Sequence, residues 1–308
     1  MFDTVIVGGG TAGLSAALVL GRARRRVLLV SDGPPRNAPA DGAHGFFTRD
    51  GTPPYELLRI GREQLEPYAT VELREIAATG MDRNNDEFTV TLATGEQVTT
   101  RTIVLATGVE DELPAIPGFA ELWGRGIYHC PYCHGWEVRD QPLGVYASGE
   151  ILMHLAPLIR NWSPDVTILT DGPDGLSESQ LATLQRLGIR RCDKPIARLK
   201  IDHAGALEGV VFKDGKELSL RGIFARTTLR PHNTLAQQLG CDLVSDGPIL
   251  GLVKVEWGGQ TTVPGVYAAG DLATPLQQVV AAAASGATVA AVINNTLIEH
   301  DVHAAATG

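Results

Sequence analysis

A glycine-rich turn near the start of the chain limits the fold more than any other feature of the sequence. Residues 4–33 read TVIVGGGTAGLSAALVLGRARRRVLLVSDG, which predicts a short strand, a turn, an Ala- and Leu-rich helix and a second strand. Gly8, Gly10 and Gly13 give that turn the spacing GxGxxG. Gly8 permits the tight turn, Gly10 lets a pyrophosphate approach, and Gly13 lets helix and strand pack closely. The segment therefore predicts a dinucleotide-binding unit with phosphates at the helix N-terminus.

Further patterns place this unit in an α/β protein. An acidic residue normally follows the second strand and binds the ribose; Ser31 is at the expected position, so we assign this contact to Asp32, which comes next. A second strand–helix–strand pattern covers 143–172. Residues 263–295 predict a strand, a Gly–Asp turn and an Ala-rich helix that we expect to be buried, because it is apolar on most sides. We therefore expect an α/β fold with two Rossmann-like, three-layer, nucleotide-binding domains.

Charge and hydropathy exclude several classes of partner. The 308-residue chain has a formal net charge of −9, which argues against nucleic acid or an anionic membrane as its partner. No run of 18 apolar residues is present, so we expect no membrane span. The N-terminus enters a strand-like run without a basic leader, which favours a cytoplasmic protein.

Two of the four cysteines lie in YHCPYCHGWE, residues 128–137. Cys130 and Cys133 have the CxxC spacing, whereas Cys192 and Cys241 stand alone. Structural disulfides are rare in the cytosol, and a zinc site needs about four ligands, so we expect neither a staple nor a metal site. A CxxC pair readily cycles between dithiol and disulfide. The spacing therefore favours a redox-active pair.

The order of these motifs resembles the low-molecular-weight thioredoxin reductase family of FAD-dependent disulfide oxidoreductases. The motifs are GxGxxG near the start, ATG at 106–108, CxxC at 130–133 and GVYAAGD at 265–271. The resemblance covers nearly the whole chain. It implies FAD as the cofactor, a homodimer, and a discontinuous FAD-binding domain of about 1–112 plus 244–308. It places the CxxC in an inserted, nicotinamide-type domain of about 113–243.

The resemblance also implies which residues contact FAD. Asp271 would bind the ribityl–phosphate region, with Gly270 making room. The family typically has Arg-Gln-Ala before the last helix, whereas this chain has Gln at 277, so that arginine is absent. The remaining expected contacts are Gly8, Gly10, Ala12 and Gly13 at the pyrophosphate, Arg36 and Asn37 near the flavin, Thr107 and Gly108 at the FAD, and Gln278 and Val279 at the isoalloxazine ring.

The residue after the CxxC departs from the reductases. They typically have an aspartate as proton donor there, whereas this chain has His134. The segment CPYCHGWE resembles instead the dithiol oxidases that close the disulfides of gliotoxin and holomycin. A thiol must lose its proton before it attacks a disulfide, and an imidazole with a pKa near 6.5 suits that task. The alternative is a turn histidine hydrogen-bonded to the backbone.

The expected nicotinamide site is also altered. Its three small positions align with Ala147, Gly149 and Leu152, and only the middle one is glycine. The 2′-phosphate of NADPH needs cations, but residues 170–180, TDGPDGLSESQ, contain no Lys or Arg and three carboxylates. We therefore do not expect NADPH use. NADH is less excluded, because Asp171 lies about where a ribose acceptor belongs.

Three functions remain open from the sequence. The favoured one is a dithiol oxidase that uses FAD and O2, forms H2O2, and acts on a small molecule. His134 would accept a thiol proton, and the family implies that Cys130 is the outer sulfur and Cys133 the inner. The second is a reductase of thioredoxin or a similar protein disulfide, fed by NAD(P)H, a ferredoxin or another flavoprotein. The third is a non-enzymatic flavin-binding redox sensor.

Four side chains near these motifs have two interpretations each. His44 lies near the same flavin face or is an ordinary loop residue. His129 tunes Cys130 or is buried structure. Tyr132 and Trp136 line a small-molecule pocket or pack in the core.

Overall fold

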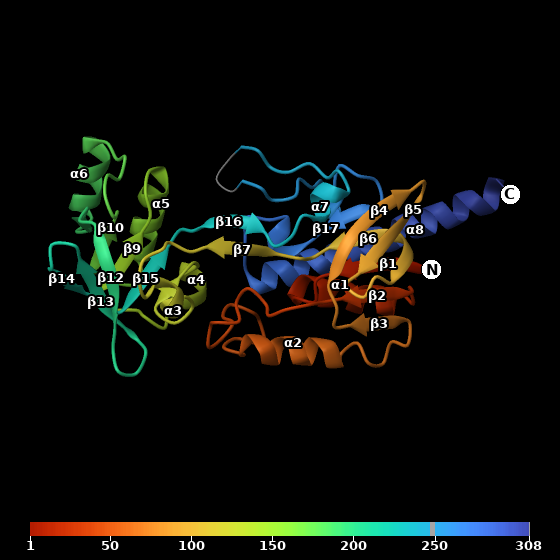
Figure 1. Cartoon of the computed structure of the whole chain (residues 1–308), viewed down its shortest axis with the longest axis horizontal. Coiled ribbons are helices and arrows are strands. Elements are labelled where there is room, and N and C mark those ends of the chain that lie inside the picture. The colour runs from red at the N-terminus through yellow and green to blue at the C-terminus, as the bar shows by residue number, and fades with distance from the viewer. Residues whose placement is uncertain (247–249, 308) are drawn as a thin grey trace. The chain divides into compact units, whose positions relative to one another are not determined.

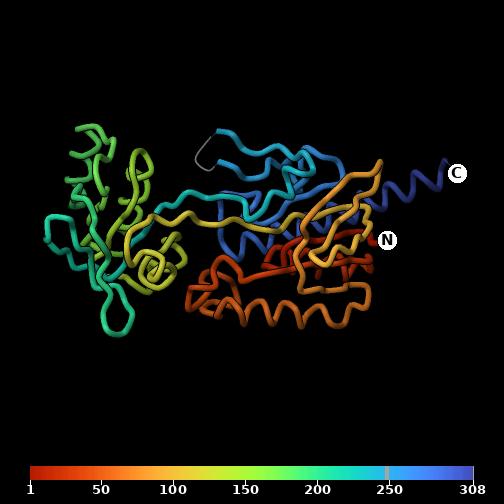
Figure 2. The backbone as a smooth tube through the Cα atoms, viewed as in Figure 1, coloured from red at the N-terminus to blue at the C-terminus, as the bar shows by residue number. Residues whose placement is uncertain are grey.

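The computed structural model describes residues 1–246 and 250–307 and divides into two compact units. Unit 1 comprises Met1–Ala38, Phe46–Glu110 and Leu229–Gly308. Unit 2 comprises Pro39–Gly45 and Asp111–Thr228. In Figure 2 the red and orange N-terminal segments and the blue C-terminal segments run into the same unit, as a discontinuous domain requires.

Unit 1 is built on a seven-stranded sheet in the order β3-β2-β1-β6-β5-β4, with β17 also pairing with β6 (Figure 1). β1, β2, β3, β6 and β17 pair in parallel, whereas β4 and β5 form an antiparallel extension. The elements of this unit are β1 (Phe2–Val7), α1 (Thr11–Arg22), β2 (Val27–Val30), α2 (Pro54–Glu63), β3 (Val71–Arg74), β4 (Ala78–Asn84), β5 (Glu87–Leu92), β6 (Gln97–Leu105), α7 (Leu235–Gln238), η1 (Trp257–Gly259), β17 (Val266–Ala268), η2 (Gly270–Leu272) and α8 (Val279–Thr307).

The two faces of this sheet carry separate cores, because successive side chains of a strand point to opposite faces. Ile6 of β1 packs with α1 and α8 on one face. Val5 and Val7 pack on the other face with β4, β5 and α7. Both faces of β1 are thus covered, which explains its run of apolar residues.

Unit 2 contains a five-stranded parallel sheet in the order β11-β10-β9-β15-β8 and a three-stranded antiparallel sheet in the order β12-β13-β14. β7 (Val109–Glu112) and β16 (Thr228–Pro231) pair where the chain leaves and re-enters unit 1. The elements of unit 2 are α3 (Phe119–Leu122), β8 (Ile127–Tyr128), α4 (Pro131–His134), β9 (Leu143–Tyr146), α5 (Glu150–Ile159), β10 (Val166–Leu169), α6 (Glu178–Arg186), β11 (Arg190–Cys192), β12 (Ile196–Ile201), β13 (Leu207–Phe212), β14 (Glu217–Ser219) and β15 (Gly222–Ala225).

The structure corrects the expected domain boundaries of 1–112, 113–243 and 244–308. Residues 229–243 belong to unit 1, because Leu235, Ala236 and Cys241 pack in the core that contains β1 and β6. Residues 39–45 belong to unit 2, although the chain on both sides of them belongs to unit 1.

Helix α8 is less buried than its composition predicted. Only one stripe of it is covered, and Val289, Ala290, Ile293 and Leu297 pack there against the α1 face of the sheet. Val302, near its end, is 64% exposed. By length and composition alone α8 is apolar enough to cross a membrane, a test that core helices of soluble proteins also pass. The buried stripe makes α8 part of the core of unit 1.

Candidate active site

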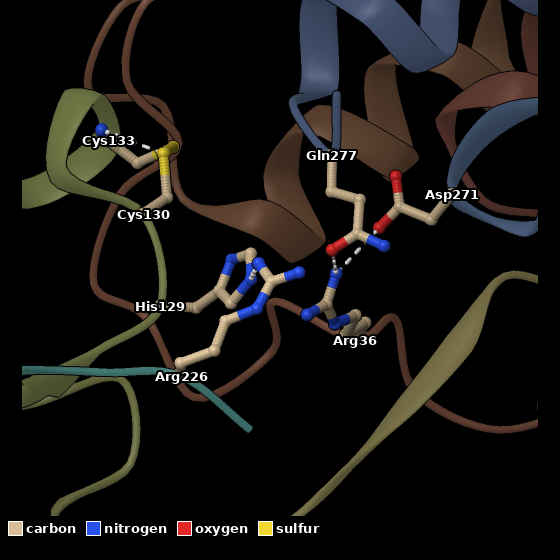
Figure 3. Close-up of a disulfide and its surroundings, with 7 residues drawn as sticks. All are labelled: Arg36, His129, Cys130, Cys133, Arg226, Asp271 and Gln277. Carbon is tan, nitrogen blue, oxygen red and sulfur yellow. Dashed lines mark hydrogen bonds and ion pairs between the residues drawn. A yellow bond between two sulfur atoms is a disulfide. The ribbon is translucent and has the colours of Figure 1, made fainter. Parts of the chain in front are cut away.

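The CxxC pair forms a disulfide at the start of the short helix α4 in unit 2 (Figure 3). Strand β8 ends at Tyr128, and Pro131 begins the helix, where its missing N–H costs nothing. The Cα atoms of Cys130 and Cys133 are 5.3 Å apart. The backbone N–H of Cys133 donates a hydrogen bond of 3.1 Å to Cys130 Sγ. That donor stabilises a thiolate on Cys130 whenever the disulfide is opened.

His134, the last residue of α4, has an imidazole ring without a hydrogen-bond partner. Both ring nitrogens are buried, and neither meets a partner among the residues that the structure describes. The ring stacks on Tyr128, with centroids 4.6 Å apart and planes inclined by 15°. Burial lowers the pKa of His134, and the carboxylate of Glu137 partly opposes that effect. The alternative of a turn histidine bonded to the backbone is therefore wrong, and a neutral ring remains able to accept a proton.

His44 lies beside His134 within unit 2. The two rings meet edge to face, with centroids 6.3 Å apart and planes inclined by 79°. His44 Nε2 is 3.6 Å from Glu137 Oε1. Because residues 39–45 pack with unit 2, this loop histidine joins the side chains around the disulfide. Sequence spacing gave no signal that Glu137 would belong to the same group.

Of the other side chains near the cysteine pair, His129 contacts a charged residue, whereas Tyr132 and Trp136 are exposed to solvent. His129 Nε2 is 3.4 Å from Arg226 Nη1 (Figure 3). Tyr132 and Trp136 are each 65% exposed, so the expectation that they pack in the core is wrong. The Arg139 guanidinium lies 3.9 Å from the centroid of the Trp136 ring. Tyr132 and Trp136, which flank Cys133 in the sequence, therefore offer exposed aromatic surface to a ligand.

At the altered nucleotide-binding turn of unit 2, one backbone N–H is bonded within the chain itself. Gly149 caps helix α5 with φ 65° and ψ −153°, a conformation that favours glycine. Its N–H donates a 2.7 Å hydrogen bond to the carbonyl oxygen of Asp174. The Asp174 side chain is 6% exposed and pairs with Arg191. Leu152 is fully buried in the core between α5 and the sheet. One N–H at the start of α5 is thus bonded by the loop after β10, whereas a Cβ on Gly149 would meet nothing within 4 Å.

Two further contacts hold this loop in place. Gln180 Nε2 donates a 2.8 Å hydrogen bond to Oε1 of Glu150, the first residue of α5. Asp171 Oδ1 accepts a 2.6 Å hydrogen bond from the backbone N–H of Ile196. Asp171 therefore serves to anchor the loop, in place of the ribose contact that its position suggested.

The glycine turn of unit 1 fits a dinucleotide. A Cβ on Gly13 would lie 1.9 Å from the Gly8 carbonyl oxygen, and one on Gly8 would lie 2.2 Å from the Ala106 carbonyl oxygen. A Cβ on Gly10 would meet nothing within 4 Å. The first two glycines are thus required by packing, whereas Gly10 faces open space. Helix α1 has no side-chain cap, so its first N–H groups are available to the FAD pyrophosphate.

A second cluster of unit 1 joins Arg36, Asp271 and Gln277 (Figure 3). Arg36 Nη1 donates hydrogen bonds to Asp271 Oδ2 at 3.0 Å and to Gln277 Oε1 at 2.9 Å. The Nε2 atom of Gln277 is buried and has no partner among the described residues. Arg36 and Asp271 were expected at the FAD, whereas Gln277 was noted only for the missing arginine. An amide donor in this cluster suits the acceptor oxygens and nitrogens of a flavin nucleotide.

The remaining predicted FAD contacts lie on the same unit. Asp32 follows β2 and is exposed. Gly270 has φ 71°, and a Cβ there would lie 2.9 Å from the Cβ of Ala12, so these two residues pack closely. Gly9, which the motif leaves unspecified, also lacks room for a side chain, since its Cβ would lie 2.4 Å from Ser31 Oγ. Thr107 and Gly108 follow β6, and Gln278 precedes α8. Asn37 lies in the loop after β2. Val279 is the first residue of α8.

Among the described residues, no group of three or more His, Cys, Asp and Glu side chains is placed to hold a metal ion. Cys192 and Cys241 are free cysteines.

Comparison with known proteins identifies the family. The model of the pyridine nucleotide-disulphide oxidoreductase family matches residues 2–286. Thioredoxin reductase sirT of Leptosphaeria maculans is 31% identical over 99% of this chain and 97% of its own length. Thioredoxin reductase aclD of Aspergillus oryzae is 34% identical over 88% of each chain. The crystal structure of HlmI superposes with a TM-score of 0.93 and 38% identity, covering 99% of this chain and 95% of HlmI.

The chain belongs to the pyridine nucleotide-disulphide oxidoreductase family. It is a thioredoxin reductase-like enzyme of the FAD-binding flavoprotein type. A further solved structure, a putative thioredoxin reductase TrxB from Bacillus anthracis, has a TM-score of 0.90 and 32% identity, covering 97% of this chain and 99% of that one. The expected family, fold class and cofactor are therefore confirmed.

Proposed function

We propose that this enzyme is an FAD-dependent dithiol oxidase that converts a small-molecule dithiol to its disulfide, with O2 as electron acceptor and H2O2 as product. The observation that carries the proposal is the hydrogen bond from Gly149 to Asp174, which takes up one N–H at the start of α5. We also infer a homodimer, as the resemblance implies, and a cytoplasmic location.

The bonded N–H at the start of α5 bears on the direction of electron flow through the cysteine pair. A reductase of this architecture takes electrons from a nicotinamide nucleotide whose pyrophosphate needs free N–H groups at such a helix. Here Asp174 takes the N–H of Gly149, and Glu150 adds a carboxylate to the first turn of the helix. The direction of a CxxC pair follows its electron donor and acceptor. Without a nicotinamide, the thiol substrate becomes the donor.

The residues around the disulfide suit a thiol substrate. His134 accepts the proton of the first substrate thiol, and the resulting thiolate attacks Cys130 Sγ. The Cys130–Cys133 bond breaks, and Cys133 leaves as a thiolate. The second substrate thiol then attacks the substrate sulfur of the mixed disulfide. Cys130 leaves as a thiolate, which the Cys133 N–H stabilises. The assignment of Cys130 as the attacked sulfur follows the family resemblance.

The overall reaction balances as one dithiol and one O2 giving one disulfide and one H2O2. FAD, when bound, supplies the acceptor for the two electrons of the reduced cysteine pair and the means of passing them to O2. The exposed rings of Tyr132 and Trp136 offer apolar surface beside the cysteines for the body of a small substrate.

The names of the curated relatives favour a second candidate. sirT and aclD are both named thioredoxin reductases. The second candidate is therefore a protein-disulfide reductase with a thioredoxin-like partner, fed by NAD(P)H, a ferredoxin or another flavoprotein.

An anaerobic reduction experiment separates the two candidates. The purified enzyme with bound FAD receives NADPH, NADH or dithiothreitol in separate runs while the oxidised-flavin absorbance is followed. We expect bleaching by the dithiol alone, then recovery with one H2O2 per dithiol oxidised when air is admitted. 2-Mercaptoethanol and the Cys130→Ser variant serve as controls for the need for two thiols and for the disulfide. Rapid bleaching by either nicotinamide would overturn the oxidase assignment.

A further inference from the structure

The loop that carries His44 is held on unit 2 by specific packing. The Pro39 carbonyl oxygen accepts a hydrogen bond of 3.4 Å from Arg125 Nε. Gly124, with φ 81°, lies so close that a Cβ on it would be 2.9 Å from the Cβ of Pro39. The position of His44 next to α4 is thus a property of unit 2 itself.

His134 has ring contacts but no hydrogen-bond partner within residues 1–246 and 250–307. Tyr128 of β8 stacks on the ring, and His44 from the 39–45 loop meets it edge-on. The titratable groups that act on it are His44 and Asp41 from that loop, Glu137 from the turn after α4, and its stacking partner Tyr128. A catalytic histidine usually has an acid bonded to its second nitrogen, which fixes its charge and tautomer. Here neighbouring charges act on His134 through space.

Two of these groups, His44 and Glu137, act on His134 in opposite directions. A proton on His44 disfavours a proton on His134, because like charges repel. The carboxylate of Glu137 favours that proton, and it also lies 3.6 Å from His44 Nε2. Half-buried charges at such distances interact more strongly than charges in bulk water. Glu137 therefore faces two imidazoles, one of which is the proposed base.

We propose that His44 and Glu137 are a pair of positioning residues that set, through opposite charges, how readily His134 accepts the substrate thiol proton. A positive charge on His44 favours the neutral form of His134, which is the form that accepts the substrate proton. Glu137 in turn stabilises the imidazolium that forms when the thiol is deprotonated. This inference rests on the proposed function, since it concerns the thiol-activating step of that reaction.

The first measurement is the titration of His134 itself. Two-dimensional ¹H–¹³C NMR follows the Cε1–H signal of His134, assigned by its loss in His134→Gln, across pH in the FAD-bound enzyme. We expect His44→Gln to raise the proton affinity of His134 and Glu137→Gln to lower it, each by roughly threefold or more. The double variant should lie between the two. Two exposed residues of unit 2 supply the matched controls His203→Gln and Glu121→Gln, which should leave the titration unchanged.

The second measurement is the pH dependence of anaerobic flavin bleaching by dithiothreitol in the same variants. We expect the acid limb of the rate to move up in His44→Gln and down in Glu137→Gln, in step with the NMR midpoints. FAD content and thermal melting confirm that each variant is folded, and His44→Asn replaces His44→Gln if that variant loses FAD.

Each outcome decides the inference. Midpoints that stay fixed, or that move in the same direction, would overturn it even if the enzyme oxidises dithiols. Opposite shifts by NMR without matching kinetic shifts would also overturn it, because the pair would not act in the reaction. If the unmodified enzyme oxidises no dithiol, the proposed function fails first, and that result comes from a separate assay.

Discussion

The backbone N–H of Gly149 donates its hydrogen bond to the carbonyl oxygen of Asp174, at 2.7 Å, at the place where a dinucleotide-binding helix would present that N–H to a phosphate. The loop that provides the carbonyl is fixed by the Asp174–Arg191 ion pair and by Gln180 on Glu150. A nicotinamide nucleotide would have to compete with the Asp174 carbonyl for the Gly149 N–H, and its phosphate would approach a helix whose first turn carries the Glu150 carboxylate.

The first prediction concerns nicotinamide nucleotides. NADPH and NADH at millimolar concentration should neither bleach the flavin anaerobically nor be consumed, because the Gly149 N–H is already bonded to Asp174 and Glu150 places a carboxylate in the first turn of α5. Absorbance at the nicotinamide and flavin bands and isothermal titration calorimetry measure consumption and binding. Measurable heat of binding to this enzyme, absent from a sample whose α5 turn is blocked by Gly149→Val, would show that the loop opens.

The second prediction separates two glycines of the unit 1 turn. Gly10→Ala should fold normally, because its Cβ meets nothing within 4 Å, yet it should lose most bound FAD, because that space is where the pyrophosphate approaches. Gly13→Ala should destabilise the apoprotein itself, because its Cβ would lie 1.9 Å from the Gly8 carbonyl oxygen. The flavin-to-protein absorbance ratio and the melting temperature of the apoprotein distinguish the two effects. Full FAD content in Gly10→Ala would remove Gly10 from the cofactor site.

The third prediction concerns His134 and pH. Burial lowers the pKa of His134, and only its neutral form accepts a proton. The rate of flavin bleaching by a dithiol should therefore hold down to pH values below the usual imidazole pKa of about 6.5 and fall as pH drops further. His134→Gln should slow that rate about 100-fold or more at neutral pH and remove the acid limb. The exposed His203→Gln serves as the control, and an unchanged profile in His134→Gln would exclude His134 as the base.

The fourth prediction tests the order of attack on the disulfide. Cys133→Ser should accumulate a mixed disulfide between Cys130 and one half of a linear disulfide such as 2-hydroxyethyl disulfide, because the other half leaves as a free thiol and the resolving sulfur is missing. Cys130→Ser should accumulate much less, because the inner sulfur is the poorer target. Mass spectrometry of the intact protein, before and after reduction, gives the adduct and its position. Equal trapping in the two variants would contradict the assignment of Cys130 as the outer sulfur.

Local motifs were sufficient for much of the fold. The spacing of Gly8, Gly10 and Gly13 specified the βαβ unit, because Gly8 and Gly13 leave no room for a Cβ and Gly10 leaves space for a pyrophosphate. The boundary at 243/244 was wrong, because the apolar residues Leu235 and Cys241 do not reveal which of two cores they enter. The burial of α8 was overestimated for a similar reason, since small apolar residues on every side of a helix do not specify which stripe is covered.

The candidate site was predictable in its chemistry but not in its contacts. The cysteine pair and His134 stand together in the sequence, so their proximity follows from the chain itself. Among the described residues, His134 has no hydrogen-bond partner. Its ring contacts with Tyr128 and His44 arise only through the tertiary fold, so the sequence does not show them. Asp171 stands about where a ribose acceptor belongs, which left NADH open, but its carboxylate accepts a hydrogen bond from the Ile196 N–H, a contact with no sequence signature.

The assignment of residues 39–45 to unit 2 also determines how the enzyme can be divided. A fragment of residues 111–228 would contain the disulfide, His134 and Glu137, but not His44. Grafting the thiol chemistry onto another scaffold would therefore require two separate pieces of sequence. Unit 2 is compact in space but is encoded by two separate segments of the chain. Recombination near residue 111 would therefore separate His44 from His134, whose ring it contacts.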